Sequence, residues 1–369
     1  MAELLALTGR HLRTSARSRA ARAAVVAFAL GLVLAALTGG GMPSASLLLI
    51  AALFVVLLVV TGFAVGAGTV LPDDRVAGRE AWLATLAPPA WKRRLSVVLA
   101  GWLLAVGIGL VGGALAGGVA TLVRDDLSLR GWQPVPLPAT RMLGGAEPVE
   151  IHLPPVAAGH GEIELEVRPL IRGLQLIDVA EILWTTDLTT GSLRVPVRGP
   201  VRFTPPVGTR QVSLALLTPG VRMRIVEARR LGPARSPIPT LAWVGLLLGL
   251  CAGTVAPVAV LLSRATSGQT AAAGAFSLLM LGSVKDGMRD LAARLEPEGL
   301  NALVPAALEA FAFLAPEAPI LEILVEATAQ RAPPLGALGS VLPALGYTLL
   351  VAVLASVPAP APLRVGVNT

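Results

Sequence analysis

Charged residues are scarce in this chain of 369 residues, because Asp, Glu, Lys and Arg together make up only 14% of it. A soluble globular domain carries roughly 25%. The deficit is uneven, since charges almost vanish over several stretches of about 20 residues and return between them, as is typical of helices that cross a bilayer. The hydrophobic content of 54% excludes disorder over most of the chain.

Cysteine and histidine are nearly absent. Cys251 is the single cysteine, so the chain forms no intrachain disulfide, and a domain outside the membrane must be held together by its core. Cys251 lies in an apolar run, and we interpret it as a small buried hydrophobic residue. His11, His152 and His160 are scattered along the chain, and their spacing predicts no metal site.

Nucleotide-binding and catalytic motifs are missing. Lys92 and Lys285 are the only lysines, and neither follows the glycines of a G-x-x-x-x-G-K-[ST] loop. The chain also lacks a nucleophile elbow and a Cys/His pair. We therefore expect a protein that is not an enzyme and binds no cofactor itself. The net charge of +7 is explained by basic loops at a membrane, so we expect no nucleic-acid partner.

The apolar runs predict an α-helical polytopic membrane protein with about six transmembrane helices. The expected spans are residues 23–38, 45–70, 97–123, 239–262, 270–284 and 335–357. The fifth is short, because it reaches bilayer length only by continuing through Lys285 and Asp286. A half-length apolar run, residues 303–314, predicts a re-entrant or interfacial helix within residues 300–332.

Arginines gather in two segments that set the expected orientation. The arm of residues 1–22 combines arginines with leucines and predicts an amphipathic elbow helix on the inner membrane surface. A signal peptide is the less favoured alternative, because the apolar run that follows is too long. The second basic segment is the loop of residues 71–96, which separates spans within residues 23–123. Basic loops stay inside, so we expect an inner (cytoplasmic) membrane protein with both termini inside.

Residues 124–236 differ from the rest in pattern. Residues 162–168 alternate strictly between charged and apolar side chains, as a half-buried strand does. Similar runs follow at 149–153, 174–183, 193–197, 201–203, 211–217 and 221–227, with prolines and glycines between them. These features predict an inserted extracytoplasmic all-β, sandwich-like domain. Residues 237–369 would then hold the remaining spans.

Glycines spaced by four residues occur on three of the expected spans. One helical turn separates them, so each set forms a smooth stripe that another helix can approach closely. The glycines are Gly62 and Gly66 on one span, Gly109, Gly113 and Gly117 on the next, and Gly245, Gly249 and Gly253 on the one after the insert. They are expected to pack helices either within one subunit or between two.

The loop between the second and third spans is the most informative polar segment. Its first part predicts a short helix with an apolar side and a charged side, ended by Pro88 and Pro89. Such a helix fits a groove on a partner protein. A plain surface loop is the alternative. The residues that would carry the contact are Asp73, Arg75, Arg79, Glu80, Trp82, Leu83 and Leu86.

The order of these parts resembles the type-2 ATP-binding-cassette export permease family. A basic arm, two spans, a charged loop with a leucine–proline element, and a third span follow one another as in that family. The matching loop residues are Arg75, Gly78, Glu80, Leu86, Pro88 and Lys92. Leu314-Ala315-Pro316-Glu317 is similar to the family's leucine–proline–asparagine element. The resemblance covers residues 1–123 and 237–360.

The resemblance implies a transmembrane permease subunit of an exporter that is moved by a separate ATP-binding-cassette ATPase subunit. ATP would bind on that partner, and the chain would pair with a second permease copy or a paralogue in the lipid bilayer. Residues 73–89 would form the coupling helix. The alternative is a non-transporting membrane-anchored protein whose extracytoplasmic β domain binds a ligand or a partner protein. The absence of ionisable residues from the first four spans suits both hypotheses.

Overall fold

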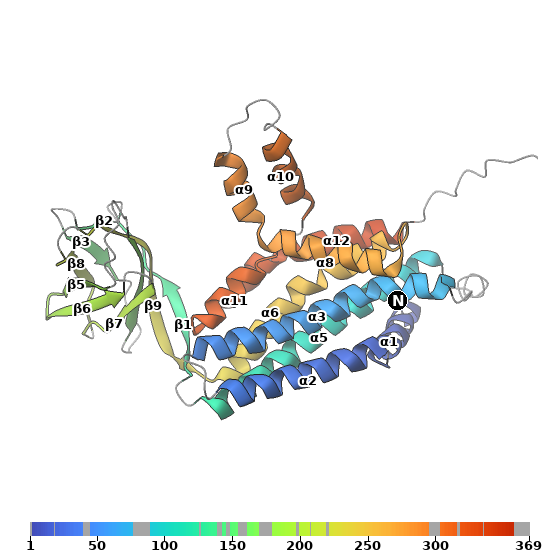
Figure 1. Cartoon of the computed structure of the whole chain (residues 1–369), viewed down its shortest axis with the longest axis horizontal. Helices are drawn as coiled ribbons and strands as arrows, with labels where there is room; N and C mark the ends of the chain where they lie inside the picture. The colour runs from blue at the N-terminus through green and yellow to red at the C-terminus, as the bar shows by residue number, and fades with distance from the viewer. Residues whose placement is uncertain are drawn as a thin grey trace, which may run out of the picture. The chain divides into compact units, whose positions relative to one another are not determined.

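The computed structural model places most of the chain. It describes residues 2–357 with gaps at 18, 40–44, 77–88, 125–126, 139–141, 145–147, 154–160, 170–178, 197–198, 207, 219–220, 295–302, 316–317 and 335. The chain divides into two compact units (Figure 1). We call Met1–Leu127 with Ser236–Thr369 the helical unit, and Ser128–Arg235 the sandwich.

Four described stretches of helix are long and apolar enough to cross a membrane. They are Ser46–Gly68 within α3 (Ala45–Val76), α5 (Ala90–Val123), Pro237–Leu262, and α12 (Ala337–Ser356). These four stretches are compatible with a multi-pass membrane protein. The separate β-sheet region, placed between the second and the third of them in the chain, agrees with the predicted fold class.

The remaining two of the six expected spans are not confirmed. The helix α2 (Arg19–Gly39) covers the first expected span, but its described apolar part is only Val25–Leu34. The helix α8 (Gly268–Ser283) is 16 residues long and ends before Lys285. Val284 leaves the helix there, and the polar helix α9 (Lys285–Arg294) begins. The extension that the fifth span needed for bilayer length is therefore absent from α8.

The span after the sandwich consists of two helices in series. Helix α6 (Pro237–Gly253) is followed by α7 (Val255–Leu262), with Thr254 between them. Pro257 has no N–H, so it cannot donate to the carbonyl of Gly253, and the backbone ladder is interrupted at this point. The hydroxyl of Thr254 donates instead to the carbonyl of Cys251 at 2.7 Å. Cys251 is buried, as its interpretation as a small apolar residue requires.

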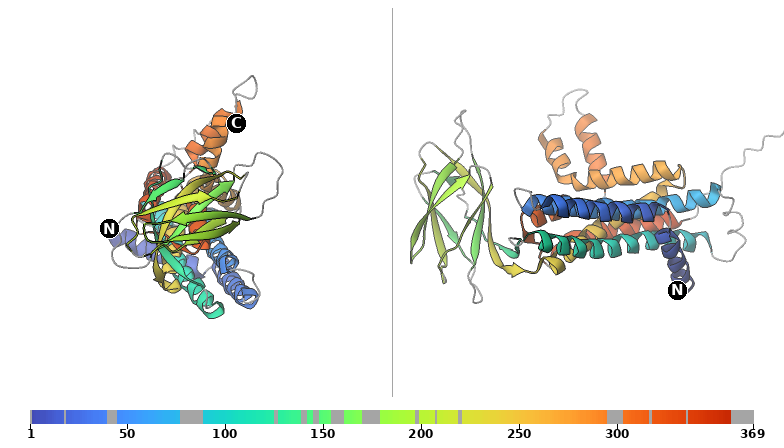
Figure 2. Two further views of the ribbon diagram at one scale, coloured as in Figure 1. Left: turned by 90° about the vertical axis from the view of Figure 1, so that its left-hand side faces the viewer. Right: turned by 60° about the horizontal axis from the view of Figure 1, so that its bottom comes forward.

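Shorter helices complete the helical unit. The N-terminal arm forms α1 (Ala2–Arg17), a helix separate from α2. The half-length apolar run forms α10 (Leu303–Leu314), which packs against α9. The chain then forms α11 (Ile320–Thr328) and the two-residue strand β10 (Arg331–Ala332). Helix α3 contacts α2, α5, α6, α7 and α8, and Figure 2 gives two further views of the chain.

The sandwich is built from nine described strands in two antiparallel sheets. They are β1 (Leu129–Pro134), β2 (Met142–Leu143), β3 (Val149–His152), β4 (Glu162–Pro169), β5 (Val179–Thr185), β6 (Thr190–Pro196), β7 (Gly199–Phe203), β8 (Gln211–Leu216) and β9 (Met223–Arg235). One sheet runs β1-β9-β4-β7, with β2 also paired to β9, and the other runs β3-β8-β5-β6. The predicted sandwich-like arrangement is therefore present.

The core of the sandwich joins the inner faces of both sheets. Ile163 and Leu165 of β4 contribute from one sheet, and Ile182 and Leu214 contribute from the other. Each of these side chains is almost completely buried. The alternation that predicted β4 has this physical cause, because every second residue of the strand enters the core. A core of this kind holds the unit together without disulfides, as the single cysteine of the chain requires.

Candidate partner-binding end of the helical unit

One end of the helical unit carries a group of basic side chains, which we call the basic end. It consists of Lys92 and Arg94 at the start of α5, Arg264 after α7, and the N-terminal helix α1. Pro89 precedes α5, and its carbonyl accepts a hydrogen bond from the backbone N–H of Lys92 at 3.0 Å. Pro89, one of the two prolines expected to end a short helix in the loop, therefore directly precedes α5.

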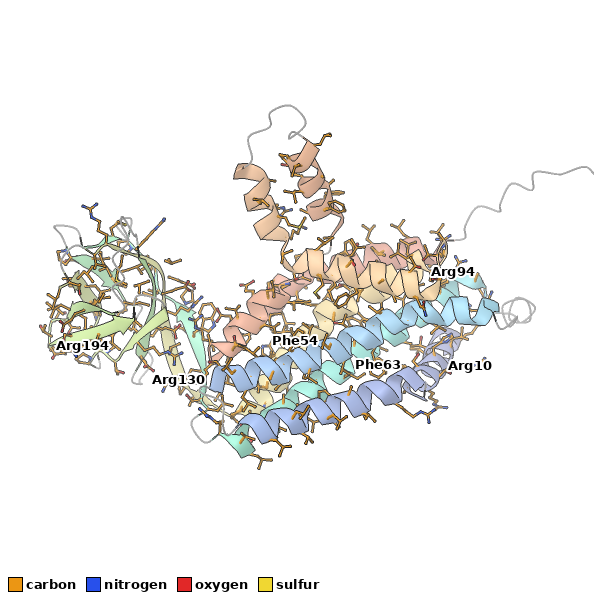
Figure 3. The ribbon with its side chains drawn as sticks, in the orientation of Figure 1. Arg10, Phe54, Phe63, Arg94, Arg130 and Arg194 are labelled. Atoms are coloured by element: carbon orange, nitrogen blue, oxygen red, sulfur yellow. The ribbon has the colours of Figure 1, made fainter. Side chains whose placement is uncertain are left out.

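Helix α1 is fastened to α5 at the basic end. The ammonium Nζ of Lys92 lies 2.5 Å from a carboxylate oxygen of Glu3. Thr8 on the same helix is buried and donates its hydroxyl hydrogen to the carbonyl of Leu4, while Arg10 is exposed. Figure 3 shows Arg10 and Arg94 near the same end of the unit. Helix α1 thus packs against the bundle while Arg10 and Arg13 are exposed, and its position on a membrane surface stays a prediction.

Two arginines hold the C-terminal end of α12 at the basic end. A guanidinium nitrogen of Arg94 donates to the carbonyl of Val357 at 2.9 Å, and one of Arg264 donates to the carbonyl of Leu354 at 3.2 Å. The last carbonyls of a helix have no partner within the helix and carry its negative dipole end, so cations stabilise them. The ends of α5, α7 and α12 are thereby joined.

Replacing both Arg94 and Arg264 with glutamine is expected to loosen the last turn of α12. The loss of two charged donors to helix carbonyls should raise amide hydrogen exchange there by about tenfold. Exchange of the peptide that covers the end of α12, measured in detergent, checks this. Arg13→Gln is the matched control, because Arg13 is an exposed arginine of α1. Unchanged exchange in the double variant would contradict the capping role.

The predicted coupling residues lie mostly outside the described residues. Asp73 and Arg75 belong to the last turn of α3, which ends at Val76. Arg79, Glu80, Trp82, Leu83 and Leu86 fall within the gap at 77–88, so their contact with a partner stays a prediction. The described ends of this gap are the C-terminus of α3 and Pro89 at the start of α5. Pro89, at the described end of the gap, lies three residues before Lys92 of the basic end.

Glycines bring α5 and α6 into close contact. A Cβ atom placed on Gly117 would lie 2.7 Å from Cα of Ile238, and one on Gly249 would lie 2.7 Å from the carbonyl oxygen of Ala105. Cβ atoms on Gly109 and Gly113 would overlap the carbonyl oxygens of Gly245 and Leu241. Gly253 accommodates the indole of Trp102 in the same way. No larger side chain fits along this contact without a backbone shift, so the two helices approach each other closely.

The two glycines of α3 have a different environment. No heavy atom lies within 4 Å of the place that a Cβ would occupy on Gly62 or Gly66. No other described helix of this chain therefore uses this stripe for close packing. Packing of Gly62 and Gly66 against a second chain stays a prediction.

Several buried hydroxyl groups lie within or next to the described spans. Ser263 and Thr348 are buried, and both donate to carbonyls of their own helices. The hydroxyl of Thr61 is buried without a hydrogen-bond partner. Among the described residues no group of three His, Cys, Asp or Glu side chains could hold a metal ion.

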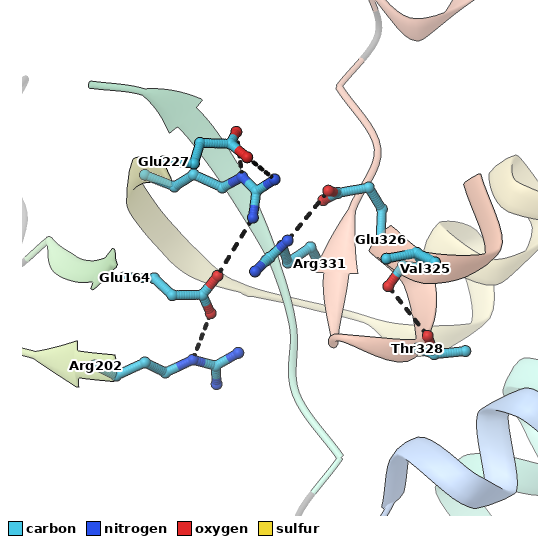
Figure 4. Close-up of polar contacts among 8 residues, drawn as sticks. Glu164, Arg202, Glu227, Val325, Glu326, Thr328 and Arg331 are labelled. Atoms are coloured by element: carbon cyan, nitrogen blue, oxygen red, sulfur yellow. Dashed lines mark hydrogen bonds and ion pairs between the residues drawn. The ribbon is translucent and has the colours of Figure 1, made fainter. Parts of the chain in front are cut away.

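The sandwich carries a charged network on the outer face of one sheet (Figure 4). Glu164 on β4 accepts a hydrogen bond from Arg202 on β7 at 2.7 Å and lies 3.8 Å from Arg229 on β9. Arg229 also binds Glu227 and lies over the ring of Trp132. Only 1% of the Glu164 side chain is exposed. These acids neutralise the arginines beside them, so this face is not a free basic surface.

Sequence reasoning missed the contacts that join the helix ends. Glu3 and Lys92 are 89 residues apart, and Arg94 and Val357 are 263 apart. No spacing rule links residues so distant in the chain, because only the packing of the bundle brings them together. The signal available in the sequence was the concentration of basic residues in the arm of residues 1–22 and the loop of residues 71–96.

No protein-family model matches the chain, and no curated protein or solved structure matches it either.

Proposed function

We propose that this chain is the transmembrane permease subunit of an exporter that is moved by a separate ATP-binding-cassette ATPase subunit. The observation that carries the proposal is the basic end. There α1, α5, α7 and α12 are tied together by Glu3–Lys92 and by the two arginine caps, and α5 begins directly after Pro89, which follows the predicted coupling residues in the chain. A partner that binds this loop would act on the ends of several helices at once.

The glycine-lined contact between α5 and α6 would transmit a displacement of the loop to the helix bundle. Pro89 joins the loop directly to α5, and the close packing of α5 on α6 makes the pair move as one body. The interruption at Thr254 and Pro257 lets α7 change its direction relative to α6. A displacement of the loop by the ATPase would therefore shift the α5–α6 pair within the bundle. This works only if the two states of the ATPase bind the loop differently.

The proposal also fixes an orientation. The basic end faces the cytosol in the inner membrane, because basic segments stay inside, and the sandwich lies on the opposite side. The chain supplies neither nucleotide binding nor catalysis, and the ATP is bound by the partner. A second permease copy or paralogue completes the complex.

Affinity purification in detergent tests the proposed function. We expect a P-loop ATPase to co-purify with the wild-type chain, in membranes from cells that express the natural complex. A variant with Arg79, Glu80 and Trp82 all replaced by alanine should lose the ATPase by about tenfold or more, since aromatic and arginine side chains dominate interface energies.

A matched control keeps this result specific. Replacing Arg10, Arg13 and Thr14 of α1 with alanine removes exposed side chains at the same end while leaving the loop intact. This control should retain the ATPase. If no ATPase accompanies the wild-type chain, the proposal fails and the alternative holds, in which the chain is a membrane anchor whose separately folded sandwich binds a partner. If the loop variant recovered as much ATPase as the wild-type chain, the loop would not be the coupling element.

A further inference from the structure

The strand β6 forms an edge of its sheet and has few of the features that normally protect an edge. Among the described strands it pairs only with β5, in an unbroken register from Thr190 to Pro196. It contains no bulge, and its proline stands at its last position. Natural edge strands are usually shortened, bulged or interrupted, because free backbone N–H and C=O groups recruit another strand.

The other short edges of the sandwich show such protection. Strand β3 has only four residues, and β7 has five with Pro200 near its start. Strand β6 has seven residues, and the side chains of Thr190, Ser192 and Arg194 are exposed on it. The contrast within one unit marks β6 as the edge that is available for pairing.

Gly191 leaves an apolar surface along this edge. The indole of Trp184 on β5 extends across Gly191, where a Cβ atom would lie 2.6 Å from the ring. The same indole stacks on Phe203, with ring centroids 5.4 Å apart. The ring of Trp184 thus covers Gly191, as an aromatic side chain on a neighbouring strand covers an edge glycine, and its partly exposed surface is apolar. Whatever pairs with β6 should therefore place an apolar residue opposite Gly191.

We propose that β6 pairs antiparallel with β6 of a second copy of this chain, about a two-fold axis at Ser192. The strand is complementary to itself in this register. Leu193 of each copy then lies opposite Gly191 of the other, so the larger side chain fills the place beside Trp184. Arg194 lies opposite Thr190, and no like charges face each other across the new pair.

The residues opposite each other also share a face. Gly191 and Leu193 pair with Trp184 and Ile182 of β5, so both lie on the core side, whereas Arg194 pairs with Glu181 on the outer side. The new pair would join the two four-stranded sheets into one continuous sheet with the same patch on both partners, as a two-fold interface requires. A single strand pair is a small interface. The inference therefore rests on the proposed function, in which two copies are held together in one membrane at high effective concentration.

Disulfide trapping in membranes tests this pairing in the full-length protein. Cys251, the single native cysteine, is replaced by alanine, and Ser192 by cysteine. Directly opposed residues have Cβ atoms roughly 4.5–5.5 Å apart, close enough for a disulfide with little backbone movement. Mild oxidation should give a product of twice the mass of the chain. Ser213→Cys is the matched control, because Ser213 is on the same face of the same sheet but in the internal strand β8.

Charge changes at Thr190 test the register. In the Ser192→Cys background, Thr190→Arg places two arginines opposite each other at both ends of the pair, and trapping should fall by about fivefold or more. Thr190→Glu should increase trapping, because a glutamate then faces Arg194. Combining Thr190→Arg with Arg194→Glu should restore it, and this rescue excludes a mere folding defect.

The outcomes that would overturn the inference are distinct from failure of the proposed function. No dimer with Ser192→Cys, equal trapping with Ser213→Cys, or no response to the charges at Thr190 would each overturn it. A trapped product that contains another protein would assign the edge to that protein. Co-purification of the ATPase with the wild-type chain needs no oxidation and no cysteine, so it reports on the proposed function separately.

Discussion

Replacing Gly113 with leucine is expected to prevent the α5–α6 pair from forming and so to unfold the helical unit. A Cβ atom at Gly113 would overlap the carbonyl oxygen of Leu241 and lie 3.1 Å from Cα of Gly245. Both obstacles are backbone atoms, so no side-chain rotation relieves them. Overpacking of this kind costs about 3 kcal/mol or more. The measurement is the fraction of protein that elutes as a single sharp peak in detergent.

Gly107 and Gly118 of the same helix provide the controls. Neither has a heavy atom within 4 Å of the place that a Cβ would occupy. Gly107→Leu and Gly118→Leu add the same side chain to α5 without meeting another helix, so both should elute like the wild-type protein. If Gly113→Leu behaved like these two variants, the close approach of α5 and α6 would be wrong.

Replacing Glu164 with glutamine is expected to destabilise the sandwich strongly. Arg229 and Arg202 both lie beside Glu164, and Arg229 is itself almost fully buried. Glu164→Gln leaves Glu227 as a carboxylate partner of the buried Arg229 but removes the buried negative charge that both arginines face, at a cost of about 3 kcal/mol. Hydrogen exchange of the amides of β4 and β9 in the full-length protein measures this loss as faster exchange of the whole unit.

Glu162→Gln is the control for this prediction. Glu162 lies two residues earlier on β4, on the same face, and it pairs with Arg130. About a third of the Arg130 side chain is exposed, at 34%, and 22% of the Glu162 side chain is exposed. An exposed ion pair contributes about 0–1 kcal/mol, so this variant should exchange almost like the wild type. Equal effects of the two substitutions would mean that burial of Glu164 does not govern its contribution.

The alternation of apolar and polar residues predicted some strands of the sandwich and missed others. The runs at 162–168 and 211–217 predicted β4 and β8 closely, because alternation records which residues enter the core. Strand β1 was missed. Its sequence, Leu129 to Pro134, contains a glycine and a terminal proline, and it extends into a sheet because β9 pairs with it across an irregular register. The pairing of β1 with β9 cannot be predicted from the residues of β1 alone.

In the helical unit, hydropathy predicted the long apolar helices but not where they break or which side chains meet. Uniformly apolar runs identified α3, α5 and α12 as spans, since length and hydropathy suffice for that purpose. The apolar part of the fifth expected span ended at residue 284, close to the end of α8 at Ser283. Its extension through Lys285 and Asp286 was left open, because hydropathy alone does not locate a break between an apolar and a polar helix. Within the candidate site, the basic residues of the loop and arm were predicted as a group. Their partners were not, because Glu3 and the carbonyls of α12 meet them only in the folded bundle.

The way in which the sandwich is inserted has a consequence for how this protein can be rebuilt. Leu129 and Arg235 pair where the chain enters and leaves the sandwich, and Gly117 contacts Ile238 where α5 ends and α6 begins. Entry and exit are thus neighbours at both junctions. Residues 128–235 therefore form an interchangeable module, because a short linker, or an unrelated domain with adjoining termini, can be grafted in their place without separating the two glycine-lined helices.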